Sequence, residues 1–306
     1  MKPLEIQILS DGKPGHENQS LGLAEALGRL RPVHVSKVAL GEVKGAIARF
    51  RSAWRQSAEL PLPQLIIGAG HATHPALLAL GRKTGAPCVV LMKPSLPSAL
   101  FELCLVPEHD LTGKQAPEHV IPTRGALNRV PPPADDHAAR EDGLILLGGP
   151  SSAYGWDGAA ITAAIRAIAA QGKRPWHITD SRRTPVGTLE AIAAELPGIV
   201  PHPHTETGRD WLPQRLGRAA EVWVTEESIS MIYEALSSGA HVGLLPVPAL
   251  RKAGRVARGI ARLAAEGYVT RYEDWAPQFP LAAPPQVLRE ADRCAAIVME
   301  RYFARR

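Results

Sequence analysis

Short apolar segments rich in β-branched residues alternate with segments of helical period, and this alternation constrains the fold more than any other feature. In the first half the apolar segments are LEIQILS, PVHVSKVAL, PQLIIGAG, APCVVLMKPS and FELCLVPEHD. Helical stretches follow the first three: QSLGLAEALGRL, GAIARFRSAWRQSA and HPALLALGRKTG. Strands that alternate with helices at this spacing predict parallel βαβ units.

The same pattern starts again after a proline-rich, acidic break at residues 129–142, which we interpret as an interdomain linker. Apolar segments then recur at GLILLGGPS, PWHITDSRRTP, IVPHPH, EVWVTEES and HVGLLPV, with helical stretches between them. A chain of 306 residues is long enough for two domains of about 150 residues each. The sequence predicts an α/β protein with a first domain over 1–135, a second over 143–285 and a helical tail over 286–306. Two such domains are expected to form a cleft between the carboxyl ends of their sheets.

The composition and charge limit the classes of ligand that we expect the protein to bind. A net charge of +5 suits anionic ligands such as nucleotides, or weak attraction to an anionic membrane surface. Aromatic residues make up only 5% and no Lys/Arg block interleaves with them, so nucleic acid is not expected. No apolar run approaches the roughly 20 residues of a membrane span, which favours a cytoplasmic protein, at most peripheral on the membrane. The three cysteines predict reduced, buried thiols. Oligomeric state is left open.

The loop SDGKPGHENQS, between the first strand and the first helix, is the most unusual. Gly12 and Gly15 permit close approach of a ligand to the backbone. His16 can exchange a proton near neutral pH and is our candidate general base for a sugar hydroxyl. Asp11 either orients the imidazole or caps the turn. The loop adds two further candidate acceptor-side residues, Glu17 and Asn18.

The loop GAGHATHP ends the third predicted strand. Gly70 belongs to a tight exit from that strand, and we take Gly70, His71 and His74 as candidate acceptor contacts, with helix capping as the alternative. The two histidines lie three residues apart, but no carboxylate or cysteine accompanies them, so no metal site is predicted.

Two loops of the second domain offer donors to phosphate. Gly148 and Gly149 end an apolar strand and leave room for a diphosphate, with two candidate donors after them, Ser151 and Ser152. The segment lacks the lysine of a P-loop and the spacing of a dinucleotide fingerprint. The loop TDSRRTP adds Ser181, Arg182 and Arg183. Adjacent arginines match phosphate oxygens in bidentate geometry, although an exposed turn paired with a nearby carboxylate is the alternative.

The segment VTEESISMIYEALSSG is the most specific one. A helix beginning near Ser228 directs its amino end, and its partial positive charge, at a phosphate. Glu226 and Glu234 are eight residues apart, and we expect them on nearly the same face of this helix. One of these carboxylates can then accept hydrogen bonds from a ribose diol. The candidate nucleotide contacts of this segment are Glu226, Ser228, Ser230, Met231 and Glu234. The alternative is a helix that serves only as scaffold.

These motifs resemble two groups of proteins. The Gly-rich, His-containing first loop and the glutamate pair of the second domain are similar to glycosyltransferases of the B type (GT-B), particularly the peptidoglycan N-acetylglucosaminyltransferase. That resemblance implies two Rossmann-like domains and a last helix that crosses back to the first domain. The segments DGKPGHENQSLGLAEAL, GAGHATHPAL, LLGGPSSAYGWD, SRRTP and VTEESISMIYEA, in this order, resemble the mitochondrial-fission ELM family, here in a bacterial member.

The resemblance leaves three functions open. The first is metal-independent sugar transfer from a nucleoside diphosphate sugar to an unidentified acceptor, with no cofactor besides the donor substrate. The second is non-hydrolysing epimerisation of a nucleoside diphosphate sugar, which needs acid/base carboxylates; Asp11, Glu17 and Glu226 are the candidates. The third is a non-enzymatic recruitment or binding protein, as the plant member of the ELM family is described.

Overall fold

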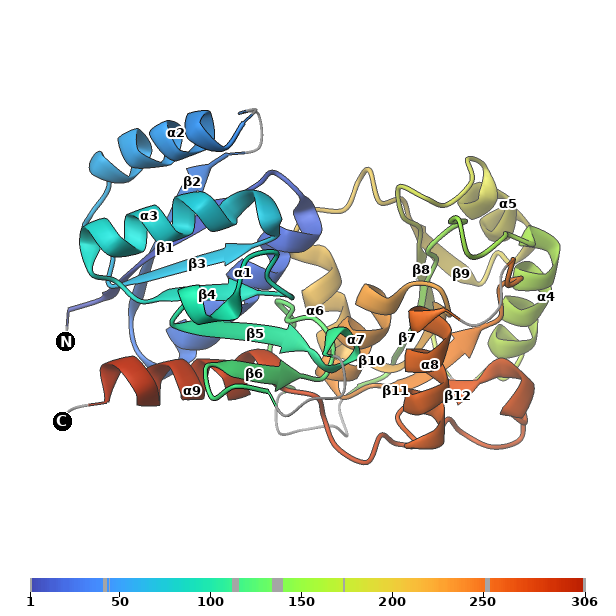
Figure 1. Ribbon diagram of the computed structural model, residues 1–306. Coiled ribbons are helices and arrows are strands. Elements are labelled where there is room, and N and C mark those ends of the chain that lie inside the picture. The colour runs from blue at the N-terminus through green and yellow to red at the C-terminus, as the bar shows by residue number, and fades with distance from the viewer. Residues whose placement is uncertain are drawn as a thin grey trace. The chain divides into compact units, whose positions relative to one another are not determined.

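The computed structural model describes residues 2–40, 43, 45–111, 116–133, 140–172, 174–250 and 254–304. The chain forms two compact units (Figure 1). Unit 1 comprises Met1–Arg129 together with Arg289–Arg306, and unit 2 comprises Val130–Leu288. Each unit is built on its own six-stranded sheet.

Unit 1 alternates strands and helices until its last strands, and the tail adds one more helix. Its elements are β1 (Leu4–Ser10), α1 (Pro14–Leu30), β2 (Val33–Ala39), α2 (Ala46–Ala58), β3 (Leu65–Ala69), α3 (His74–Thr84), β4 (Cys88–Leu91), β5 (Leu103–Pro107), β6 (Val120–Thr123) and α9 (Glu290–Phe303).

The sheet of unit 1 is parallel, in the order β2-β1-β3-β4-β5-β6. Helices α1 and α9 pack on one face and α2 and α3 on the other (Figure 1). Because both faces are covered, the central strands β3, β4 and β5 are buried along their whole length. This burial explains why they read as continuous apolar runs rather than alternating ones.

Unit 2 repeats the βα alternation. Its elements are β7 (Asp142–Leu146), α4 (Gly158–Ala169), β8 (Trp176–Thr179), α5 (Thr188–Glu195), β9 (Ile199–His202), α6 (Trp211–Arg218), β10 (Ala219–Thr225), α7 (Ile229–Ser238), β11 (His241–Leu245), α8 (Arg255–Ala265) and β12 (Thr270–Arg271).

The sheet of unit 2 is also parallel, in the order β12-β11-β10-β7-β8-β9. Counted from its first strand this is the 3-2-1-4-5-6 order of the Rossmann fold. Helices α6, α7 and α8 pack on one face, and α4 and α5 on the other. The indole of Trp223 on β10 is fully buried on the face of the sheet that α4 and α5 cover.

The C-terminal segment contributes to the cores of both units. Leu288 is buried in the core of unit 2. The helix α9 follows directly, and its apolar stripe of Ala291, Ala295 and Val298 is buried in unit 1 against α1. An ion pair from Arg29 to Asp292 adds to this contact. Among the described residues, no helix has the length and apolar character needed to cross a bilayer.

Candidate functional site

The candidate residues of unit 1 follow β1 and β3. These strands are hydrogen-bonded neighbours although β2 separates them in the sequence. The chain therefore leaves the sheet in opposite directions on either side of this point, and open α/β sheets bind ligands at such a place. The predicted loops at residues 10–20 and 68–75 both begin here, but the first is shorter than expected. Helix α1 already starts at Pro14, so Gly15, His16, Glu17 and Asn18 lie in its first turns rather than in a loop.

Asp11 and His16 form a pair at this edge. Asp11 Oδ2 lies 2.9 Å from His16 Nδ1, and Asp11 Oδ1 accepts a hydrogen bond from the backbone N–H of Lys13. The imidazole is 18% exposed, whereas the Asp11 carboxylate is only 4% exposed. A carboxylate that accepts the Nδ1 proton fixes the ring and its tautomer, and leaves Nε2 to exchange a proton with a ligand. Asp11 thus both orients the ring and caps the turn.

Gly70, in the loop after β3, supports this pair. It has a φ of +85°, and a Cβ there would lie 2.4 Å from His16 Nδ1 and 3.0 Å from Asp11 Oδ2. Only glycine allows the backbone to approach the imidazole so closely. Gly12 also has a positive φ, of 82°. By contrast, a Cβ at Gly15 would meet nothing within 4 Å, so local packing does not require glycine at that position.

Two other predicted residues of unit 1, Glu17 and His74, have hydrogen-bond partners inside the unit. Glu17 is buried, its Oε1 lies 2.7 Å from Lys37 Nζ, and its Oε2 accepts a hydrogen bond from Ser10. His74, the first residue of α3, is also buried, with Nδ1 3.0 Å from Ser95 Oγ. Burial lowers the pKa of His74. Asn18 is half-buried and His71 is exposed.

The predicted loops of unit 2 meet where β7, β8 and β10 end. β7 and β10 are the neighbours between which the strand order of this sheet reverses. The N–H of Gly148 donates to Thr225 Oγ1 over 2.8 Å, and the N–H of Gly149 donates to Glu227 Oε1 over 2.7 Å. A Cβ at Gly148 would lie 1.9 Å from Glu227 Oε1. The two glycines therefore bring the end of β7 against the loop after β10.

Arg183 ties the loop after β8 to the other two. Its guanidinium donates to the carbonyl of Gly149 over 2.9 Å and to Ser228 Oγ over 3.2 Å, and lies 3.7 Å from Glu227 Oε1. The side chain is still 45% exposed. Ser181 Oγ donates to the carbonyl of Gly148 over 2.9 Å.

The remaining predicted donors of these loops differ in accessibility. Arg182 and Ser152 are exposed and form no hydrogen bond within the described part of the chain. Ser151 is exposed too, but its Oγ accepts from the backbone N–H groups of Ala153 and Tyr154 and so closes a turn. Arg182 is therefore the arginine of the pair that is available to a ligand without rearrangement.

Glu227 is the residue that sequence reasoning missed. Its side chain is 1% exposed, and among the described residues Oε2 has no hydrogen-bond partner. Burial raises the pKa of the Glu227 carboxyl, and the hydrogen bond from Gly149 partly opposes this shift. The sequence shows two adjacent glutamates after β10 and does not distinguish the inward one from its neighbour.

The helix α7 begins at Ile229, with Ser228 as its N-cap. Ser228 is buried, Ser230 is exposed, and Met231 packs on the core of unit 2. Glu226 precedes the helix, and its Oε1 accepts from the backbone N–H of Val247. Because Glu226 lies outside the helix, helical periodicity does not place it on the same face as Glu234, contrary to our expectation.

Glu234 lies half-buried on α7, and burial raises the pKa of its carboxyl to about 7. The pKa of this carboxyl is higher in the folded than in the unfolded state. Its contribution to the free energy of unfolding is therefore fully present below about pH 4.5 and is lost as pH rises through 7. We expect Glu234→Gln to be more stable than the native chain at pH 8 by about 1–3 kcal/mol, and nearly equal at pH 5. Urea unfolding at both pH values measures this difference.

The exposed Glu206 on the same unit provides the control for this prediction. Glu206→Gln should show the same difference between pH 5 and pH 8 as the native chain. An unaltered pH dependence in Glu234→Gln would mean that this carboxyl titrates as an exposed one.

These units define the protein's class: α/β, with two Rossmann-like units of the GT-B type. The family model of Mitochondrial fission ELM1 matches residues 14–302, and the chain belongs to this family. No curated protein matches the sequence.

Solved structures share the fold at low sequence identity. UDP-GlcNAc 2-epimerase from Methanocaldococcus jannaschii is 9% identical with a TM-score of 0.56, over 98% of this chain and 100% of that one. UDP-GlcNAc 2-epimerase from Neisseria meningitidis, bound to UDP-GlcNAc, is 11% identical with a TM-score of 0.54, over 98% and 99%. MurG from Acinetobacter baumannii is 11% identical with a TM-score of 0.49, over 97% and 100%.

Proposed function

We propose that this protein is a nucleotide-sugar-dependent glycosyltransferase that transfers a sugar from a nucleoside diphosphate donor to an acceptor hydroxyl. The observation that carries the proposal is the junction of three loops in unit 2. Gly149, Arg183 and Ser228 meet there beside the amino end of α7, at the point where the strand order reverses. That combination of backbone, guanidinium and helix terminus suits a diphosphate.

Unit 2 would bind the donor. The exposed part of Arg183 and the exposed Arg182 provide charge that offsets the developing charge of the leaving diphosphate. The amino end of α7 adds its partial positive charge. Glu234, about one and a half turns into that helix, is our candidate acceptor of hydrogen bonds from the ribose diol.

Unit 1 would bind the acceptor, with His16 as the general base. Nε2 takes the proton from the acceptor hydroxyl as its oxygen bonds to the anomeric carbon. The bond from that carbon to the diphosphate breaks, and the nucleoside diphosphate leaves with the electron pair. Asp11, 2.9 Å from Nδ1, stabilises the imidazolium that forms.

Epimerisation of a nucleoside diphosphate sugar is the second candidate. It is favoured by the fold shared with UDP-GlcNAc 2-epimerases at TM-scores of 0.56 and 0.54. This reaction needs carboxylates near the sugar carbon. Glu17 is already paired with Lys37 and Asp11 with His16, which makes Glu226 the better candidate of the three. A recruitment role within the ELM family needs neither nucleotide nor sugar chemistry.

Calorimetric titration with UDP, GDP and CMP tests the proposal. We expect saturable binding of one nucleotide, weakened about tenfold or more in Arg183→Met, because a charge-assisted hydrogen bond is worth about 1.5–3 kcal/mol. Arg166→Met is the control, since Arg166 pairs with Glu195 away from these loops. Absence of binding to every nucleotide would favour recruitment. A product assay with labelled nucleotide-sugar then separates transfer from epimerisation.

A further inference from the structure

A polar pocket lies at the edge of the sheet of unit 2 where its strands begin, opposite the donor loops. It has a volume of about 190 Å³, which is room for roughly six water molecules. Its lining residues are Arg140, Arg174, Ala220, Glu221, Gly239, His241 and Pro280. Arg140 and Arg174 precede β7 and β8, Glu221 is near the start of β10, and His241 is the first residue of β11. The pocket is therefore separate from the loops assigned to the donor.

Within the described residues, Arg140 has hydrogen-bonding capacity that is not used. Its Nη1 donates to the carbonyl of Ser238 over 2.8 Å, at the end of α7. Its Nη2 is buried and has no hydrogen-bond partner among the described residues. A buried donor without a partner is costly, so an acceptor in the pocket gains a strong contact once the Arg140 side chain turns to expose Nη2.

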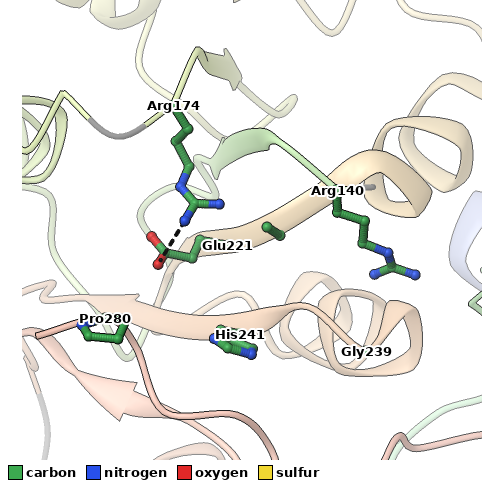
Figure 2. Close-up of a pocket in the computed structure, with 7 residues that line it drawn as sticks. Arg140, Arg174, Glu221, Gly239, His241 and Pro280 are labelled. Carbon is green, nitrogen blue, oxygen red and sulfur yellow. Dashed lines mark hydrogen bonds and ion pairs between the residues drawn. The ribbon is translucent and has the colours of Figure 1, made fainter. Parts of the chain in front are cut away.

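The other polar groups line the same pocket. Arg174 Nη2 donates to Glu221 Oε1 over 3.3 Å, a long contact that leaves other guanidinium donors of Arg174 available. His241 is opposite Glu221 in the register of β10 and β11 and is half-buried. No hydrogen bond to the His241 ring occurs within the described residues. Figure 2 shows Glu221 paired to Arg174, and Arg140 apart from this pair with its guanidinium turned away from it.

We propose that this pocket binds the phosphate group of a small molecule through Arg140, Arg174 and His241. Two guanidinium groups against one carboxylate leave a net positive charge. Donors that approach from three elements suit a tetrahedral ion with several acceptor oxygens better than a planar carboxylate. This site is independent of the proposed glycosyltransferase function, because none of its residues belongs to the donor or acceptor loops.

Inorganic phosphate is the probe, with the backbone amide signals of Gly239 and His241 followed by NMR. We expect saturable shifts with a dissociation constant of about 1 mM, and weaker shifts with acetate. Arg140→Met should weaken phosphate binding about tenfold or more. Because this variant also loses the contact with Ser238, its folding is checked by circular dichroism.

Glu221→Gln provides a test whose expected result, tighter phosphate binding, an unfolded variant would not show. This variant removes the opposing carboxylate and frees Arg174, so phosphate should bind at least about threefold more tightly. Arg183→Met, in the donor loops, should leave these shifts unchanged and thereby separates this site from the proposed function. Absent shifts, equal binding of acetate, or unchanged affinity in both Arg140→Met and Glu221→Gln would overturn the proposal.

Discussion

Gly149→Ala is expected to lower the free energy of unfolding by about 1–3 kcal/mol and to weaken nucleoside diphosphate binding about tenfold or more. A Cβ at this position would lie 2.1 Å from the carbonyl oxygen of Arg183 and 2.7 Å from the backbone nitrogen of Thr184. These are main-chain atoms, so the loop after β8 must move rather than a side chain turning aside. That movement breaks the contacts through which Arg183 joins the three loops.

Gly217 on α6 provides the matched control. A Cβ there would meet nothing within 4 Å, and alanine is the better helix former by up to about 1 kcal/mol. Gly217→Ala should therefore keep or raise stability and leave nucleotide binding unchanged. Urea unfolding and calorimetric titration of both variants measure these effects. Tight nucleotide binding by a folded Gly149→Ala protein would exclude the loop junction as the diphosphate site.

The alternation of apolar and helical segments was sufficient to predict the α/β class and parallel βαβ units in both halves of the chain. The Rossmann-like form of the units was implied by the resemblance to GT-B glycosyltransferases. The missed elements are those whose pattern is weak. β6 contains Pro122 and lies at an edge of its sheet, where proline is tolerated. β12 has only two residues, and α6 contains both Pro213 and Gly217. In each case tertiary contacts, rather than local preference, determine the structure.

The sequence placed the candidate residues at strand ends but did not determine which way their side chains turn. Glu226 and Glu227 are adjacent and chemically identical, yet only Glu227 accepts the N–H of Gly149. Glu17, one residue after His16, instead pairs with Lys37 on β2. These contacts depend on which strands are neighbours in the sheet. A single sequence does not specify that order, so the inward-facing carboxylate of unit 2 was not identified.

His16→Ala is expected to reduce turnover about 10²- to 10⁴-fold, the usual contribution of a general base, while nucleotide affinity stays nearly unchanged. The structure gives this prediction a physical basis, because the imidazole is held by Asp11 at 2.9 Å and is still 18% exposed. Single-turnover rates with an identified donor and acceptor, together with calorimetric titration of the nucleotide, measure the two quantities separately.

Two variants distinguish a catalytic His16 from one that only packs within unit 1. His34→Ala removes an exposed histidine near the start of β2, away from the carboxyl ends of the strands, and should leave turnover unchanged. Gly70→Ala keeps the imidazole but introduces a Cβ that would lie 2.4 Å from Nδ1, so it should displace the ring and lower turnover nearly as much as its removal. If a folded His16→Ala protein retains full turnover, the ring is not the base. In that case the close approach of Gly70 to the ring serves the stability of unit 1 alone.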